Sequence, residues 1–143
     1  FVAEQVKRGI AAMAFGDLYL EGVRRYREDK LQGTGLAPLF PLWQMPTRTL
    51  VRDMIAAGVK AYVTCLDPRK LPQRLAGQCL DDAFLAELPS EVDPCAENGE
   101  FHTFAAAGPM FARPIGVTTG EIVQRGGFVF CDLLPTLQPE YAN

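Results

Sequence analysis

Histidine is almost absent from this sequence, because His102 is the only one among 143 residues. The four cysteines are widely spaced, and no two of them form the Cys-x-x-Cys pair that many zinc sites use. A zinc site is therefore not expected, and no residue is assigned as a metal ligand of that kind. Cys65 and Cys131 lie in apolar runs. We expect both to be reduced thiols in the core of a cytoplasmic protein.

Long apolar segments and runs of basic residues are missing as well. No stretch approaches the roughly 18–20 apolar residues that a membrane-spanning helix needs. The net charge is −3, and no cluster of lysine and arginine could follow a phosphate backbone. We therefore expect neither a membrane nor a nucleic acid as partner. With 48% hydrophobic and 22% charged residues, the composition is that of about one globular domain.

Residues 1–68 alternate strand-like and helix-like patterns, which is typical of an α/β fold. The expected elements are an initial helix ending at Lys7-Arg8-Gly9, a buried parallel strand at 10–15, a helix at 21–31, an extended segment at 36–43, an amphipathic helix at 47–57 and a strand at 60–66. Pro38 and Pro41 exclude a helix from the extended segment. We expect the strands to be parallel and joined by crossovers.

Residues 69–134 have a different, smaller α+β pattern that is rich in hairpins. We expect a short helix at 81–88 and strands at 101–106, 115–118, 121–125 and 128–133, with a tail over 135–143. Gly126-Gly127 stands between two alternating runs, which predicts a tight hairpin turn. Two parallel strands leave open edges that need neighbours. Because the chain also begins with an apolar helix and no methionine, we expect it to be the second half of a longer protein, or one subunit of an oligomer that completes the sheet.

The densest group of polar side chains lies around the Asn98-Gly99 turn, where Glu97, Asn98, Glu100 and His102 fall within six residues. Alternation in the strand that follows predicts that Glu100 and His102 share one face, opposite Phe101. Two carboxylates, an amide and an imidazole would then converge on a ligand site. The alternative is a structural turn before a half-buried strand.

Three blocks of sequence, in the same order, resemble the diphthine–ammonia ligase family. They are Gly16-Asp17-Leu18-Tyr19-Leu20-Glu21 with Arg24 and Tyr26-Arg27-Glu28, then Gly35-Leu36 with 38–43, and finally Asp93-Pro94-Cys95 with 97–104 and Gly108-Pro109. The resemblance covers about residues 1–133. It implies an adenine nucleotide alpha-hydrolase-like fold of the N-type ATP pyrophosphatase group. Residues 1–68 would be the carboxyl-terminal part of its Rossmann-like nucleotide-binding domain, and 69–134 the substrate side.

The resemblance implies ATP and Mg²⁺ as cofactors and an ATP-dependent reaction in which a carboxylate is adenylated and ammonia displaces AMP. The carboxylate would be that of diphthine on an elongation factor two-like protein, or an unknown small molecule in bacterial relatives. However, the family's Ser-Gly-Gly-Lys-Asp-Ser phosphate loop is absent from this sequence. A missing amino-terminal half or a partner subunit would have to supply it. The alternative functions are a substrate-binding fragment and a bacterial adenine-nucleotide hydrolase-like protein.

The resemblance also implies roles for individual residues. Glu97, Glu100 and His102 are the expected catalytic groups, because a carboxylate or imidazole could take a proton from ammonium. Substrate contacts are expected from Arg24, Arg27, Asn98, Gly99 and Thr103. Gly16 and Asp17 are expected to contact the cofactor, through Mg²⁺ or a ribose hydroxyl. For the two arginines the alternative is a solvated face with Glu21, Glu28 and Asp29 as partners. For Trp43 with Phe40, core packing is favoured over a quaternary-ammonium pocket.

Overall fold

The computed structural model describes residues 1–136, which divide into two compact units. The first unit spans Phe1–Pro46, and the second begins at Thr47. This division lies well before the boundary that the sequence suggested at residue 68. The predicted tail at 135–143 lies outside the described residues apart from Pro135, which ends the last strand, and Thr136.

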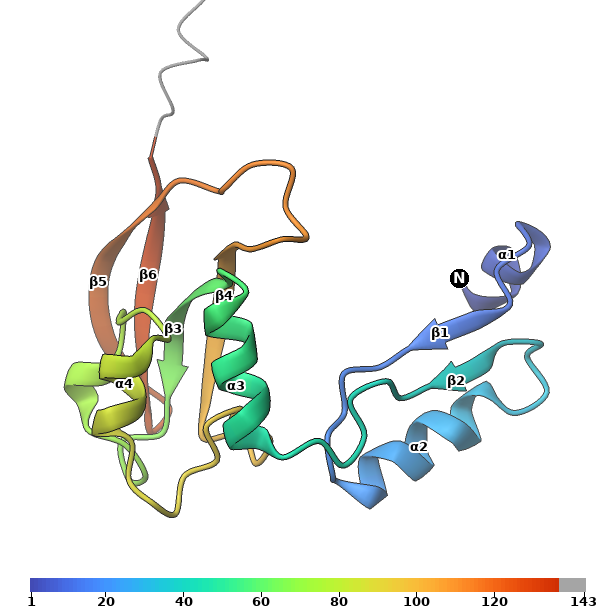
Figure 1. The fold of residues 1–143 in the computed structure, drawn as a ribbon, viewed down its shortest axis with the longest axis horizontal. Helices are drawn as coiled ribbons and strands as arrows, with labels where there is room; N and C mark the ends of the chain where they lie inside the picture. Colours follow the sequence, from blue (N-terminus) through green and yellow to red (C-terminus); the bar gives the residue numbers. More distant parts are fainter. Residues whose placement is uncertain (137–143) are drawn as a thin grey trace, which may run out of the picture. The chain divides into compact units, whose positions relative to one another are not determined.

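The first unit is a small strand–helix–strand arrangement (Figure 1). Helix α1 spans Val2–Lys7, strand β1 spans Ala12–Ala14, α2 spans Glu21–Leu31 and β2 spans Ala37–Leu39. The two strands are parallel, with Ala12 opposite Ala37 and Ala14 opposite Leu39, so α2 is the crossover that parallel pairing requires. The parallel direction expected for the strand at 10–15 is observed, but its partner is the extended segment at 36–43 and not the strand at 60–66. The predicted burial is wrong, because two of the three residues of β1 are exposed within this chain.

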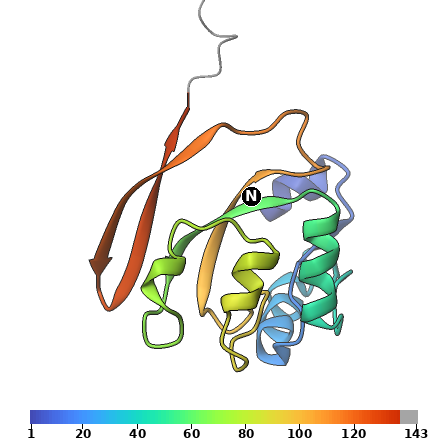
Figure 2. The same cartoon turned by 60° about the vertical axis from the view of Figure 1, so that its left-hand side comes forward.

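The second unit is built on a four-stranded antiparallel sheet. Its elements are α3 (Thr47–Ala56), β3 (Lys60–Leu66), the 3₁₀ turn η1 (Gln73–Leu75), α4 (Asp82–Glu87), β4 (Phe101–Ala107), β5 (Val117–Arg125) and β6 (Phe128–Pro135). The strand order is β4-β3-β6-β5. Figure 2 shows β5 and β6 as a long hairpin, which turns at Gly126-Gly127 as predicted.

Strand β3 corrects the expected topology. Its bounds are those predicted, but it pairs antiparallel with β4 and with β6 instead of extending a parallel sheet. A short apolar run does not encode the direction of its partner, which here comes from sequence far downstream. The segments expected as two strands at 115–118 and 121–125 form the single strand β5, which is interrupted by an irregularity between Thr119 and Ile122.

The core of the second unit lies between the sheet and the segments that cover one of its faces. Val63, Leu66, Phe101 and Val129 face the covering residues of η1 and α4, of which Leu75 and Phe84 are fully buried. Phe84 and Phe101 meet edge to face, with ring centroids 5.4 Å apart. Helix α4 begins as its sequence predicts, because the Asp81 carboxylate accepts a hydrogen bond from the Phe84 N–H. None of the helices within residues 1–136 has the length and apolarity to cross a membrane.

Candidate functional site

The loop before β4 is organised by the carboxylate of Glu100, which is only 3% exposed. Its Oε1 accepts hydrogen bonds from the Asp93 N–H (3.3 Å) and from the Asn98 side-chain amide (3.2 Å). Its Oε2 accepts one from the Asn98 N–H at 3.1 Å. The Glu100 carbonyl accepts a further bond from the Asp67 N–H (2.9 Å), which ties the loop to the end of β3. Glu100 therefore closes residues 93–100 into a fixed loop.

Two tight turns complete this loop. The Asp93 carboxylate accepts the Cys95 N–H, and the Asp93 carbonyl accepts the Ala96 N–H. Ala96 has a φ of 57° and Gly99 a φ of 72°, so both lie in the left-handed region. An alanine is disfavoured there, because its Cβ crowds the following carbonyl oxygen. Ala96 therefore holds a backbone conformation that would suit glycine better.

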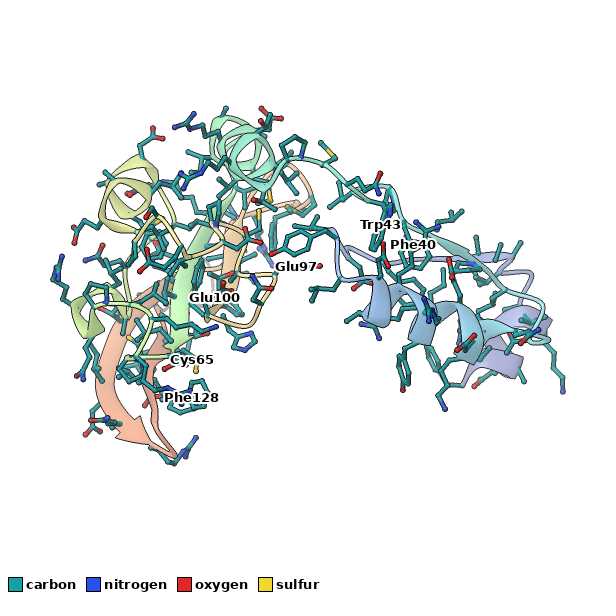
Figure 3. The ribbon with its side chains drawn as sticks, turned by 90° about the horizontal axis from the view of Figure 1, so that it is seen from below. Phe40, Trp43, Cys65, Glu97, Glu100 and Phe128 are labelled. Carbon is teal, nitrogen blue, oxygen red and sulfur yellow. The ribbon has the colours of Figure 1, made fainter. Side chains whose placement is uncertain are left out.

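Glu97 and Asn98 lie at the tip of the loop, where Glu97 is half-buried and Asn98 is exposed. Glu97 and Glu100 are both labelled in Figure 3. The nearby thiol of Cys95 donates to the Thr47 carbonyl at 3.4 Å. Burial, with the charges of Asp93 and Glu97, raises the pKa of this thiol to about 11. Cys95 is therefore a protonated donor at neutral pH and not a nucleophile.

The expected convergence of Glu100 and His102 is not observed. Glu100 precedes the first residue of β4, so strand alternation does not govern its direction, and its carboxylate is enclosed by the loop. His102 is exposed and stands opposite Cys65 in the β3–β4 register. Thr103, the next residue of β4, is exposed and pairs with Val63.

His102 contributes to a recess of about 730 Å³ in the second unit. The recess is also lined by side chains that the sequence analysis did not connect with His102, namely Thr64, Cys65, Val123, Arg125, Phe128, Phe130, Cys131 and Asp132. Cys65 and Phe128 are labelled in Figure 3. Cys65 is thus only half-buried, which corrects its assignment to the core, whereas Cys131 is buried as expected. Desolvation raises the pKa of the Cys65 thiol.

The candidate residues of the first unit form a second cluster. Arg27 Nε lies 3.5 Å from Asp17 Oδ2, and both atoms are buried without a hydrogen-bond partner. Gly16, beside Asp17, has open space where a side chain would begin. An ion pair this loose leaves hydrogen-bonding capacity on both sides, so a hydroxyl group of a ligand could bridge the two side chains.

Arg24 and Arg27 lie on the same face of α2, as their spacing of three residues predicted. Aromatic rings hold both guanidinium groups. The Arg24 guanidinium lies 4.7 Å from the ring centroids of both Phe40 and Trp43, and Arg27 lies 5.0 Å from that of Phe15. Arg24 also pairs with Glu28 at 2.8 Å. Phe40 and Trp43 therefore already hold a cation from this chain, which agrees with packing and not with an empty pocket for a quaternary ammonium.

A charged pair outside the predicted residues holds the start of the segment after β3. The Asp67 carboxylate accepts two bonds from the Arg69 guanidinium, at 2.8 and 2.7 Å, and one from the Arg69 N–H at 3.0 Å. These bonds lower the pKa of Asp67 to about 2. The Asp67-Pro68-Arg69 sequence at the end of a strand was the available signal, since aspartate commonly bonds the backbone two residues on.

Comparison with known proteins identifies the second unit. A family model for the diphthamide synthase C-terminal domain matches residues 46–134, which correspond closely to the unit that begins at Thr47. The chain belongs to the diphthamide synthase family. Glu97, Asn98, Gly99, Glu100, His102 and Thr103 all lie inside the matched region, whereas Gly16, Asp17, Arg24 and Arg27 lie outside it.

Individual relatives extend the similarity into the first unit. The diphthine–ammonia ligase of Rattus norvegicus is 32% identical over 124 residues, which cover 82% of this chain and 46% of that protein. That of Homo sapiens is 30% identical over 122 residues, with the same coverage. That of Schizosaccharomyces pombe is 27% identical over 128 residues and is covered to only 21% of its length. The chain therefore spans about half the length of the curated mammalian relatives it matches, and less of the yeast protein.

Proposed function

We propose that this chain is the substrate-facing half of an ATP-dependent, amide-forming ligase of the diphthine–ammonia ligase type. In such a reaction a carboxylate is joined to AMP with release of pyrophosphate, and ammonia then displaces AMP to form the amide. The proposal is supported by membership of the diphthamide synthase family and by relatives that are named diphthine–ammonia ligases. The acceptor is proposed to be diphthine on an elongation factor two-like protein.

The observation that carries this proposal is the loop closed by Glu100. Three donors hold the Glu100 carboxylate, so that group is a positioning residue. Glu97 is the half-buried carboxylate at the tip of the loop. A side chain on a fixed loop loses little conformational entropy when it reaches the geometry for proton transfer, which favours catalysis by a positioned base. We propose that Glu97 takes the proton that ammonium must lose before the nitrogen attacks.

The other candidates receive roles that agree with where they lie. His102 and Thr103 are both exposed on β4, and His102 lines the recess of about 730 Å³, so both are proposed to contact the substrate. Asn98 and Gly99 shape the tip that presents Glu97. Arg24 and Arg27 are proposed to bind an anionic group of the substrate at the first unit.

ATP and Mg²⁺ fit the residues of this chain only in part. The buried, unpartnered atoms of Asp17 and Arg27 suit a hydroxyl of a ribose. Within residues 1–136, however, no group of three or more acidic, histidine or cysteine side chains could hold a metal, and the 143-residue sequence has no phosphate loop. Backbone N–H groups of such a loop are needed to approach the phosphates closely. We propose that another segment or a partner subunit supplies them, and assign no step through the nucleotide to these residues.

The test separates the two half-reactions. Glu97→Gln, made in the polypeptide as it occurs in its native source, should still release pyrophosphate from ATP in the presence of the carboxylate substrate. Its rate of amide formation should fall by about 10²–10⁴-fold, the usual contribution of a positioned base. Pyrophosphate release and the incorporation of ¹⁵N-ammonia would be measured on the same samples.

Glu121→Gln is the matched control, because Glu121 is exposed on β5. It should leave both half-reactions unchanged. If Glu97→Gln retains both half-reactions at the control's level, Glu97 is not the base. If it loses both, the loop acts before the attack of ammonia.

One alternative is favoured by a specific observation. The recess around His102 lies wholly within this chain, so a substrate-binding module or an adenine-nucleotide hydrolase-like protein with a small-molecule substrate would also use it. Parallel assays with diphthine-bearing elongation factor two and with a panel of small carboxylic acids distinguish these functions. Turnover of a small acid alone would favour the alternative.

A further inference from the structure

The second unit has a separate cavity between α3 and α4, two helices that lie side by side in Figures 1 and 2. Its volume is about 270 Å³, and it shares no lining residue with the recess around His102. The floor is apolar, since it includes Val51 (1% exposed) and Val92 (4% exposed) with Leu85 and Leu88. The cavity is thus large enough for a compact apolar group of a ligand.

Two arginines stand at the rim of this cavity. Arg48 and Arg52 are exposed and lie one helical turn apart, so they share a face of α3. Among the described residues, neither guanidinium takes part in an ion pair, hydrogen bond or ring contact. Arg24 and Arg69 differ in this respect. Arg24 lies over the Trp43 ring, and Arg69 forms an ion pair with Asp67.

The placement of these arginines is unfavourable for α3 by itself. Like charges four residues apart on a helix repel each other. Arg48 also lies in the first helical turn, which contains no acidic residue, and the positive end of the helix dipole disfavours a cation there. An anion bound between the two guanidinium groups would relieve both effects, and its hydrogen bonds would be charge-assisted.

We propose that this cavity binds an organic anion with a compact apolar body and a carboxylate or phosphate head. The body would occupy the floor formed by Val51, Leu85, Leu88 and Val92, and the head would lie between Arg48 and Arg52. Asp82, the first residue of α4, also lines the cavity and opposes the anion from the other side. The site uses neither ATP nor ammonia, and it meets the loop of residues 93–100 at Pro94.

Titrations followed by amide chemical shifts of the intact chain test the proposal, with phenyl phosphate and benzoate as probes. For ligands of this size a Kd on the order of 1 mM is expected. Shifts should centre on Leu85, Leu88 and Val92. Phenol has the same body without the charge, and inorganic phosphate has the head without the body. Each should bind at least about tenfold more weakly, because it lacks one half of the recognised chemistry.

Substitutions at the cavity should change the affinity for the probes in opposite directions. Arg48→Gln with Arg52→Gln should weaken phenyl phosphate about tenfold or more, whereas Arg25→Gln, an exposed arginine on α2, should change nothing. Asp82→Asn should tighten binding about threefold, since it removes a like charge. Ala86→Phe, at the cavity wall, should block both probes with the arginines intact. Binding that survives the double arginine variant, or inorganic phosphate that binds as tightly as phenyl phosphate, would overturn the proposal.

Discussion

Replacing Glu100 with glutamine should destabilise this protein more than any other single change of an acid to its amide in the loop. Glutamine keeps one oxygen but places an amino group where the second oxygen accepted hydrogen bonds. Because Oε1 and Oε2 each accept a backbone N–H, either orientation of the amide leaves one of these donors facing another donor. The substitution therefore removes a charge-assisted bond and leaves the N–H of Asp93 or of Asn98 without its acceptor, at a side chain of residue 100 that is only 3% exposed.

The magnitude follows from those two losses. A hydrogen bond to a charged group contributes about 1.5–3 kcal/mol, and a buried unsatisfied donor costs about 1–3 kcal/mol. Since the two are not additive, we expect the free energy of unfolding to fall by about 2–3 kcal/mol. For a unit of this size that corresponds to a decrease in Tm of about 10 °C. Urea unfolding at constant temperature gives the free energy directly, and thermal unfolding gives the Tm.

Glu121→Gln provides the reference, because an exposed glutamate on β5 should change stability by less than about 0.5 kcal/mol. The reasoning would be refuted if Glu100→Gln were as stable as this reference. The Glu100 carboxylate would then not hold the loop, and its assignment as a positioning residue would fail with it.

Two further changes test the fold by the same unfolding measurements. Because Arg69 lowers the pKa of Asp67 from 3.8 to about 2, the stabilisation by this pair is fully present above about pH 4 and is lost as the pH falls through 2. Arg69→Gln should therefore be less stable than the wild type at pH 6, and most of that difference should have disappeared near pH 2. A difference at pH 2 as large as that at pH 6 would exclude the ion pair as its cause. Gly77→Ala should cost about 2–3 kcal/mol, since its φ is +79° and the new Cβ would lie 2.8 Å from Cys131 Sγ. Gly126→Ala, with a φ of +59° and no nearby atom, should cost only about 1 kcal/mol, and equal losses would contradict the steric argument.

Local sequence signals predicted the helices closely. The bounds expected for α2 are those observed, because a charged amphipathic segment is followed by glycines with φ values of 72° and 87° at Gly33 and Gly35. Helix α3 ends one residue earlier than expected, ahead of Gly58 with a φ of 82°. In each case the residues that end the helix lie within a few positions of it, so the sequence carries the whole signal.

Strand partners and side-chain directions could be predicted only in part. The sheet partners of β3 depend on residues near 101–107 and 129–130, and the apolar run at 60–66 contains nothing that specifies them. For the candidate site, alternation correctly placed His102 on the face opposite the buried Phe101, but it failed for Glu100, because the strand begins one residue later. The enclosure of Glu100 depends on donors at Asp93 and Asn98, which only the folded loop brings to one point.

We propose that this chain belongs to an enzyme that forms an amide from ammonia and the carboxylate of diphthine. The most direct measurement is mass spectrometry of elongation factor two that bears diphthine, after incubation of the polypeptide from its native source with ATP, Mg²⁺ and ¹⁵N-ammonia. We expect that one carboxyl oxygen is replaced by ¹⁵N at the diphthine residue, in a reaction that needs ATP. An unchanged diphthine mass, with a small carboxylic acid converted to its amide or ATP hydrolysed alone, would contradict it.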